Sequence, residues 1–354
     1  MPGVWSQLPQ ITDYPAHLEA AWQQHLAPRE PNAPTVISTF AGGGGSSLGY
    51  SMAGYRELLA VEWDNNAVET FRLNFSGIPV YHGDIAKLSV EECMKLAGLT
   101  EPRQLDVLDG SPPCQGFSTS GKRIMDDPRN QLFREYVRLL RGLQPKVFVM
   151  ENVSGMVKGK MKLIFADIMR ELKASGYVVS ARLLNAMWFG VPQSRQRVIF
   201  IGVREDLEIE PSHPKAEYRP VTLKRAIADK RGNDLQPPTS ETNLYVKRIR
   251  TIKPGQSIGN VYGQGFNWIR CHLDKPVPTI PKSTTYKGFT FLFLPDGTRC
   301  LSGRELARCA SYPDKYDFSG LFQDAVARIG NSVPPLFMRA IARHIRQTVL
   351  DHDQ

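Results

Sequence analysis

Short apolar runs alternate with amphipathic stretches along most of the chain after Pro34. The runs that have the length and composition of buried strands are 36–40, 58–61, 105–108 and 147–150. Between them, segments such as 67–74 and 131–140 carry apolar residues at helical spacing. A further pair of runs, 177–185 and 198–203, is expected to complete the same sheet. This alternation predicts an α/β fold with a mostly parallel sheet and helices on both faces.

The pattern changes at both ends of this region. Prolines punctuate residues 1–34, where only 16–26 predicts a short helix, so we expect an N-terminal appendage. A packing arm, a DNA-contacting arm and a dimer contact remain open for it, and two tryptophans slightly favour packing. Residues 204–303 are rich in Pro, Gly, Thr and Tyr, and no strong helix is expected after about Asp229. This stretch predicts a second, loop-rich lobe. Helical patterning returns at 304–310 and 335–349.

Composition excludes several classes of protein. The 354 residues suit one large domain or a domain with a second lobe, and no apolar run approaches the roughly 20 residues that span a bilayer. We therefore expect no membrane segment, no secretory signal and a cytoplasmic location. The five cysteines are Cys93, Cys114, Cys271, Cys300 and Cys309. Their odd number and wide spacing argue against a disulfide framework or a zinc ribbon, and we expect no metal.

A glycine-rich loop, FAGGGGSSLG at 40–49, follows the first predicted strand. Successive glycines allow a tight turn and the close approach of a ligand. Glu62 ends the next strand about 20 residues later, where a carboxylate can bind ribose hydroxyls. Trp63 offers a flat face for adenine, and Asp84 follows the third strand. Because Ser47 replaces the third glycine of GxGxxG, an adenosine ligand without a pyrophosphate is favoured; a glycine turn without a ligand is the alternative.

A cysteine loop, DGSPPCQGFS at 109–118, follows the fourth strand. Strand ends at this edge of an open sheet are where such folds bind ligands. Pro112 and Pro113 fix the backbone immediately before Cys114, and Gly116 relieves crowding after it. Rigid geometry around one thiol suits a nucleophile, although a structural cysteine is the alternative.

Two further strand ends carry polar groups. Glu151-Asn152-Val153 follows the fifth strand, and a carboxyl in an enclosed site can be held protonated and act as an acid. QSRQR lies between the last two strands. In an extended backbone its alternation would send Gln193, Arg195 and Arg197 to one side. Taken alone, each of these motifs is also compatible with a surface salt bridge.

Together these pieces resemble the C5 DNA cytosine methyltransferase family. The resemblance runs in order from Phe40 to about Ile345 and includes RELARCASYPDKYDF at 304–318 and GNSVPP at 330–335. PCQ, ENV and QxRxR in this order and spacing are highly specific. The family implies a Rossmann-like fold of the S-adenosylmethionine-dependent methyltransferases, with a doubly wound, mostly parallel sheet. It further implies a discontinuous catalytic domain at 35–203 and 325–354 and a target recognition domain at 204–324, whereas the appendage at 1–34 departs from the minimal family pattern.

The resemblance also implies the roles of individual residues. S-adenosylmethionine would be held by Phe40, Ala41, Gly42, Gly44, Gly45, Glu62, Trp63, Asp84, Ile85, Pro112, Asn331 and Ser332. The catalytic set would be Cys114, Glu151, Arg195 and Arg197, supported by Pro113, Gln115 and Asn152. Duplex DNA would be contacted by Ser118, Lys122, Arg123, Gln193, Arg270, Thr279, Lys282 and Lys287. The thiolate would add to cytosine C6, and C5 would then take the methyl group and release its proton.

The net charge of +9 is concentrated in the second lobe. Residues 245–303 hold nine Lys or Arg and two acids, a net charge of +7, with aromatic residues interleaved. Basic and aromatic residues on loops suit phosphate contacts and insertion into a groove, although a solvated basic face is the alternative. The family implies that this lobe reads the target sequence, with the enzyme a monomer on DNA and any cognate restriction endonuclease a separate protein.

Three other functions compete with this interpretation. A related branch methylates tRNA with the same cysteine motif, typically with Thr where Ser118 stands, and carries a Cys-Phe-Thr element that this sequence lacks. A catalytically silent DNA-binding homologue is disfavoured by the intact Cys114, Glu151 and Arg195. A nicotinamide-dependent oxidoreductase would account for Glu62 but for neither PCQ, ENV nor the basic lobe.

Overall fold

The computed structural model describes residues 4–113, 131–157, 161–229, 244–263, 268–284 and 290–351. Its centre is a seven-stranded sheet with the strand order β3-β2-β1-β4-β5-β8-β6. The strands are β1 (Thr35–Thr39), β2 (Arg56–Glu62), β3 (Val80–His82), β4 (Val107–Gly110), β5 (Val147–Val153), β6 (Tyr177–Asn185) and β8 (Gln196–Arg204). Strands β1 to β5 pair in parallel, and β8 runs antiparallel between β5 and β6. The mostly parallel sheet predicted from the sequence is confirmed.

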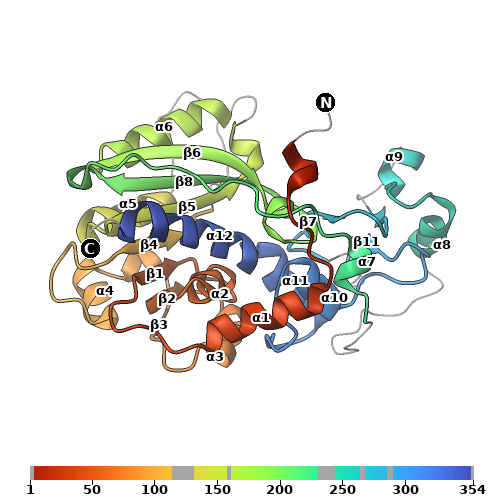
Figure 1. The fold of residues 1–354 in the computed structure, drawn as a ribbon, viewed down its shortest axis with the longest axis horizontal. Coiled ribbons are helices and arrows are strands. Elements are labelled where there is room, and N and C mark those ends of the chain that lie inside the picture. The colour runs from red at the N-terminus through yellow and green to blue at the C-terminus, as the bar shows by residue number, and fades with distance from the viewer. Residues whose placement is uncertain are drawn as a thin grey trace.

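Helices cover both faces of the sheet because neighbouring strand residues point to opposite sides. Val36 and Val107 enter a core shared with α1 (Tyr14–Leu26), α2 (Gly45–Met52) and α12 (Pro335–Ile345). Ile37 and Leu108 enter a second core. The helices of this second face are α4 (Val90–Ala97), α5 (Gln131–Leu143) and α6 (Met161–Lys173). Helix α3 (Asn65–Asn74) follows β2. Figure 1 shows α12, from the end of the chain, lying beside α2 from its beginning.

The N-terminal segment packs along both parts of the molecule. Asp13 caps α1 by accepting a hydrogen bond from the Ala16 amide, and Pro15 occupies the first turn. Tyr14 and Trp22 are buried in the main core, and the Tyr14 hydroxyl donates to the Arg308 carbonyl. Of the three expectations for this appendage, the buried side chains of α1 fit the packing arm.

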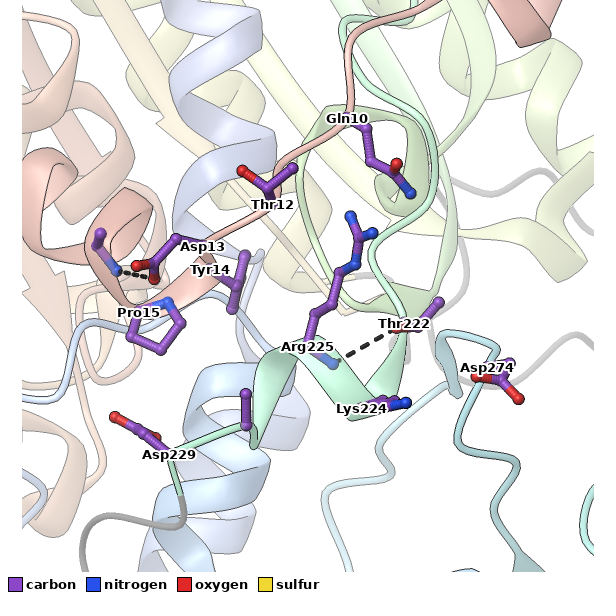
Figure 2. Close-up of a pocket in the computed structure, with 12 residues that line it drawn as sticks. Gln10, Thr12, Asp13, Tyr14, Pro15, Thr222, Lys224, Arg225, Asp229 and Asp274 are labelled. Carbon is purple, nitrogen blue, oxygen red and sulfur yellow. Dashed lines mark hydrogen bonds between the residues drawn. The ribbon is translucent and has the colours of Figure 1, made fainter.

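A cavity of about 800 Å³ separates this arm from α7 (Leu223–Ala226). Figure 2 shows Arg225 reaching from α7 toward Gln10 of the arm, where its guanidinium donates to the Ile11 carbonyl at 2.7 Å. Asp229, on the same wall, is paired with the buried Arg308. Arg225 and Asp229 thus both have partners within the chain, and the bond from Arg225 to Ile11 ties the arm to the second lobe.

The second lobe contains helices that the sequence did not predict. After α7 its elements are α8 (Leu244–Thr251), α9 (Ile258–Tyr262), β9 (Ile269–Arg270), β10 (Val277–Pro278), β11 (Leu292–Phe293) and α10 (Gly303–Cys309), and α11 (Phe322–Asn331) leads back into the catalytic domain. The expectation of no strong helix after Asp229 was wrong for α8. This helix buries Ile249 in a small separate core with Ile252, Trp268 and Phe293, and tertiary packing of that kind overrides weak local propensity. No described helix is long and apolar enough to cross a membrane.

Candidate active site

The predicted motifs meet at one edge of the sheet, where the parallel strands β1, β2, β4 and β5 end. The glycine loop leaves β1 with left-handed backbone at Phe40, Gly42 and Gly44, with φ values of 55°, 56° and 87°. A Cβ on Gly42 would meet no atom within 4 Å, so the backbone here is open on one side. A Cβ on Gly44 would lie 2.5 Å from the Phe75 ring, so this part of the loop is closely packed. Ala41 is fastened to β2 by its amide, which donates to the Val61 carbonyl.

Glu62 organises the neighbouring strand end. Its carboxylate accepts from the Gly42 amide at 2.7 Å and from the Trp63 and Asp64 amides at 2.8 and 2.9 Å. The side chain of Trp63 is 76% exposed beside it, a large flat surface with no cover from the described chain. Asp84 follows β3 and caps the short helix that begins at Ile85, which is buried. At this strand end the Trp63 ring is exposed, whereas both Glu62 carboxylate oxygens accept from backbone amides.

The C-terminal segment reaches the glycine loop as the sequence suggests. A Cβ on Gly45 would lie 2.5 Å from the Val333 carbonyl and 2.9 Å from the Ser332 side chain, so only glycine allows this contact. Asn331 is exposed at the same turn. The Tyr316 hydroxyl donates to the Gly43 carbonyl from the segment before α11. Two stretches nearly 300 residues apart therefore form one wall.

The predicted acid and one predicted arginine form a close pair at this edge. The Arg197 Nε lies 2.5 Å from the Glu151 Oε1, and their side chains are 13% and 11% exposed. Asn152, the next residue, donates from Nδ2 to the Pro112 carbonyl at 3.2 Å. This bond ties β5 to the first residues of the cysteine loop, and Pro113 beyond it is exposed. The predicted residues of that loop, Cys114, Gln115, Ser118, Lys122 and Arg123, lie outside the described residues.

The side chains of QSRQR alternate between buried and exposed, as the sequence predicts. Two of its inward side chains, however, are enclosed by protein and do not face an open site. Gln193 and Arg195 are 1% and 3% exposed, whereas Ser194 and Gln196 are exposed. Gln193 accepts from the Ile280 amide at 3.1 Å and lies 3.5 Å from the Cys309 carbonyl. With both ends of its amide engaged inside the protein, Gln193 has no surface to offer DNA in this conformation.

Arg195 is held equally firmly. Its two terminal nitrogens donate to the carbonyls of Ile280 at 3.3 Å and Gly330 at 3.0 Å. Burial, and then the nearby positive charge of Arg197, lower the pKa of Arg195 to about 9. Both terminal nitrogens are thus engaged by backbone, which leaves Arg197 as the arginine that faces Glu151.

The DNA-reading candidates of the second lobe differ in how they are placed. Thr279 and Lys282 are exposed, and Thr279 donates to the Ser194 carbonyl at 2.9 Å. Arg270 is half-buried, and its guanidinium donates to the Pro295 and Ile252 carbonyls at 2.6 and 2.7 Å. Arg270 therefore holds the lobe's own loops together, and Lys287 lies outside the described residues.

Sequence reasoning missed two buried acids behind the glycine loop. Asp109 on β4 is 2% exposed and accepts from the Tyr50 hydroxyl of α2 at 3.3 Å. Burial raises its pKa to about 7, the Ser46 and Tyr50 hydroxyls lower it, and Glu151 raises it further. Burial also raises the pKa of Glu57 on β2 to about 8, against the opposing effect of the Ser38 hydroxyl. Glu57 stands directly before the predicted strand 58–61 and Asp109 directly after the predicted strand 105–108, so the only available signal was a charged residue beside each strand.

The sequence model of the C-5 cytosine-specific DNA methylases matches residues 34–347. The chain belongs to this family. As a C-5 cytosine-specific DNA methylase, it has a sheet of the kind that S-adenosylmethionine-dependent methyltransferases share, and it is a DNA cytosine-5 methyltransferase. Among the described residues, no group of His, Cys, Asp or Glu is arranged to hold a metal ion.

Characterised relatives span nearly the whole methylase. Type II methyltransferase M1.HphI of Haemophilus parahaemolyticus is 35% identical over 336 residues, covering 88% of this chain and 86% of the relative. M.DdeI of Desulfomicrobium norvegicum is 34% identical and covers 88% of both chains. M.NgoPII of Neisseria gonorrhoeae is 32% identical and covers 92% of this chain and 99% of its own.

Solved structures share the fold of this methylase. A protein described as a DNA modification methyltransferase encoded within a prophage of E. coli superposes with a TM-score of 0.73 at 24% identity, covering 90% of this chain and all of its own. The S. pombe Dnmt2 methyltransferase superposes with a TM-score of 0.63 at 18% identity, covering 91% of this chain and all of its own. Both are similar in fold.

Proposed function

We propose that this enzyme methylates C5 of one cytosine within a short sequence of duplex DNA, with S-adenosylmethionine as the methyl donor. The observation that carries the proposal is the Glu151–Arg197 pair, 2.5 Å apart, beside a strand end that Asn152 ties to Pro112. An acid, a base-binding arginine and the start of a loop bearing one thiol then share one edge of the sheet. These are the groups that addition to a cytosine ring requires.

The residues of the glycine loop fit the proposed cofactor. Trp63 is exposed for an adenine ring, Glu62 lies at the adjoining strand end, and Gly42 leaves open space where a side chain would otherwise project. The turn at Asn331 and Ser332 closes the other side, where an amino-acid group would lie. When bound, S-adenosylmethionine supplies an electrophilic methyl group.

The residues of the chain act on the cytosine. We propose that the Cys114 thiolate forms a bond to C6, which makes C5 electron-rich enough to take the methyl carbon as the bond from that carbon to the sulfonium sulfur breaks. Glu151 donates a proton at N3, so that negative charge does not build up on the ring, and Arg197 binds the O2 oxygen. A water molecule then removes the C5 proton, the bond from the Cys114 sulfur to C6 breaks, the double bond between C5 and C6 returns, and the N3 proton goes back to Glu151.

The target base has to leave the duplex for this chemistry. Both faces of a stacked cytosine are covered by its neighbours, so C6 cannot meet a thiolate inside the helix. We propose that the base is flipped into the edge lined by Glu151 and Arg197. The basic lobe is proposed to hold the flanking phosphates.

The competing substrates are less well supported. The curated relatives are named type II methyltransferases, and the family model is specific for DNA. The likeness to a Dnmt2 structure is one of fold at 18% identity. Because the relatives are type II enzymes, we also propose that a separate endonuclease reads the same sequence and that the methyltransferase acts as a monomer.

The test is expression in a host without cytosine methylation, followed by base-resolution mapping of 5-methylcytosine. We expect marks at one short motif, and none when Cys114→Ala is expressed at the same level. The variant should still bind S-adenosylmethionine, because the thiol lies outside the cofactor residues. Unmodified DNA together with methylated tRNA would overturn the choice of substrate, and normal turnover by Cys114→Ala would overturn the nucleophile.

A further inference from the structure

Three segments that are far apart in the sequence meet at one buried arginine. β7 (Gln193–Ser194) pairs in parallel with β10 (Val277–Pro278) in a separate two-stranded sheet, which joins the second lobe to the segment between β6 and β8. Arg195 follows β7 directly and is 3% exposed. One of its terminal nitrogens donates to Ile280, next to Thr279, and the other donates to Gly330, next to Asn331. One planar guanidinium therefore joins the lobe to the cofactor turn.

The backbones of the two segments also touch at this point. A Cβ on Gly330 would lie 2.2 Å from the Pro281 carbonyl oxygen and 2.5 Å from the Lys282 amide nitrogen. Both neighbours are main chain, so neither segment can yield locally to a side chain. A shift of the 279–282 segment must consequently move the turn at 330–332, or break its bonds to Arg195.

The cofactor turn is coupled to the glycine loop in the same rigid manner. The Val333 carbonyl and the Ser332 side chain lie within 2.9 Å of the position that a Cβ on Gly45 would take. The Tyr312 hydroxyl would lie 2.7 Å from the same Cβ. Closely packed interiors transmit displacement instead of absorbing it. The path from Thr279 to the glycine loop thus contains no open gap.

We propose that Arg195 is a positioning residue that couples DNA binding in the second lobe to cofactor binding at the glycine loop. The inference rests on the proposed function and assigns Arg195 a task separate from contact with the base. Its two fixed donors hold Ile280 and Gly330 at a set separation. DNA that fixes the position of the 279–282 segment then also fixes the turn at Asn331 and Ser332. By thermodynamic linkage, cofactor binding at that turn strengthens DNA binding by the same factor.

The test measures binding of S-adenosylhomocysteine, which cannot be turned over, with and without a duplex carrying the motif found by methylation mapping. We expect the duplex to tighten cofactor binding in the unmodified enzyme by about 5- to 150-fold, the usual range for coupled sites. In Arg195→Lys, a single nitrogen replaces two that are fixed apart in one plane, so the two carbonyls are no longer held at a set separation and we expect that factor to fall to within about threefold of one. The affinity for each ligand alone should change much less.

Arg339→Lys is the matched control, because Arg339 is also buried and bonds Gln24 away from this junction. It should keep the coupling of the unmodified enzyme. If Arg195→Lys does not fold, Gly330→Ala gives the same test, since its methyl group forces Pro281 away from the turn. Undiminished coupling in the folded variant, or independent binding of the two ligands in the unmodified enzyme, would overturn the inference. Absence of any methylated motif would instead contradict the proposed function.

Discussion

The carboxyl of Glu151 is neutralised by Arg197 in the free enzyme, at 2.5 Å and with little exposure of either side chain. In the proposed mechanism Glu151 donates at N3 and therefore has to hold a proton, so its ion pair with Arg197 would be exchanged for a proton and a base contact when cytosine binds. Two groups that were predicted separately from ENV and QSRQR thus behave as one unit. Their pairing depends on β5 and β8 being neighbours, which the sequence alone did not specify.

Glu151→Gln keeps the shape and a hydrogen-bond donor but cannot transfer a proton. We expect methylation at saturating cofactor to fall by about 10²- to 10⁴-fold, the usual contribution of a general acid. Binding of S-adenosylmethionine should stay within about threefold of the unmodified enzyme, because Glu151 is outside the cofactor residues. Single-turnover rates and equilibrium binding measure the two effects. Glu62→Gln, the opposite case, should weaken cofactor binding first; an equal loss of binding in both variants would contradict the division of roles.

The buried acids Glu57 and Asp109 should make stability depend on pH. Their pKa values are about 8 and 7 in the folded chain, raised by burial, so both keep a proton that the unfolded chain loses at lower pH. Stability from these groups is complete below the unfolded pKa values near 4 and is lost as pH rises to 7 and 8. Glu57→Gln removes one titrating group and should flatten this loss, by about 2–4 kcal/mol between pH 4.5 and 8.

Urea unfolding at pH values across this range measures the effect for Glu57→Gln and for Asp109→Asn. Glu69→Gln is the control, because Glu69 is exposed on α3 and should leave the slope of stability against pH unchanged. If the free energy of unfolding changes with pH in the same way in the unmodified chain and in both buried-site variants, these carboxyls do not carry the predicted protons.

Most elements of the sheet and its helices followed from local pattern, since buried strands and amphipathic helices differ in period. The helix predicted at 131–140 appears as α5, with Phe133 and Tyr136 buried at the expected spacing. Helix α8 was missed because its Ile249 packs in a core made by Trp268 and Phe293, which lie later in the chain. The direction of β8 was also not predictable, because antiparallel pairing with β5 and β6 depends on the connections between them.

Helix α1 offers a prediction at the same scale. Leu18 is 2% exposed and Leu26 is 56% exposed on the same helix. Leu18→Ala should lower the free energy of unfolding by about 2–5 kcal/mol, whereas Leu26→Ala should change it by less than about 0.5 kcal/mol. Urea titration of both variants is the measurement. Equal effects would mean that the arm is not part of the cooperative fold.

Over the whole molecule, the positive charge is uneven. The lobe at 245–303 carries a net +7 of the total +9, and Lys247, Lys253 and Lys282 are exposed there. The net charge of the lobe could be counted from the sequence. The sequence did not show which of its charged side chains are exposed and which bond to other parts of the lobe. Arg270 is engaged by carbonyls within the lobe, and its partners Pro295 and Ile252 become neighbours only after folding.

Replacing these three lysines by glutamine should weaken DNA binding most at low salt. For every lysine that pairs with a phosphate, its replacement should reduce the slope of log K against log salt by about 0.9. Lys95→Gln and Lys173→Gln, exposed on α4 and α6, provide matched controls that should not alter the slope. DNA affinity is measured from low to moderate salt for the lobe variants and for the variants on α4 and α6. An equal change of slope in both sets would contradict DNA binding by the lobe.

Helix α12 has a consequence for how the enzyme is made. It packs on α2 and, with the turn before it, closes the glycine loop, yet it is made after every strand of the sheet and after the second lobe. A growing chain has therefore already made Cys114, Glu151 and the basic residues of the lobe before the glycine loop can close. Termination before α12 should consequently leave a fragment with part of one sheet face uncovered instead of a weakly active enzyme.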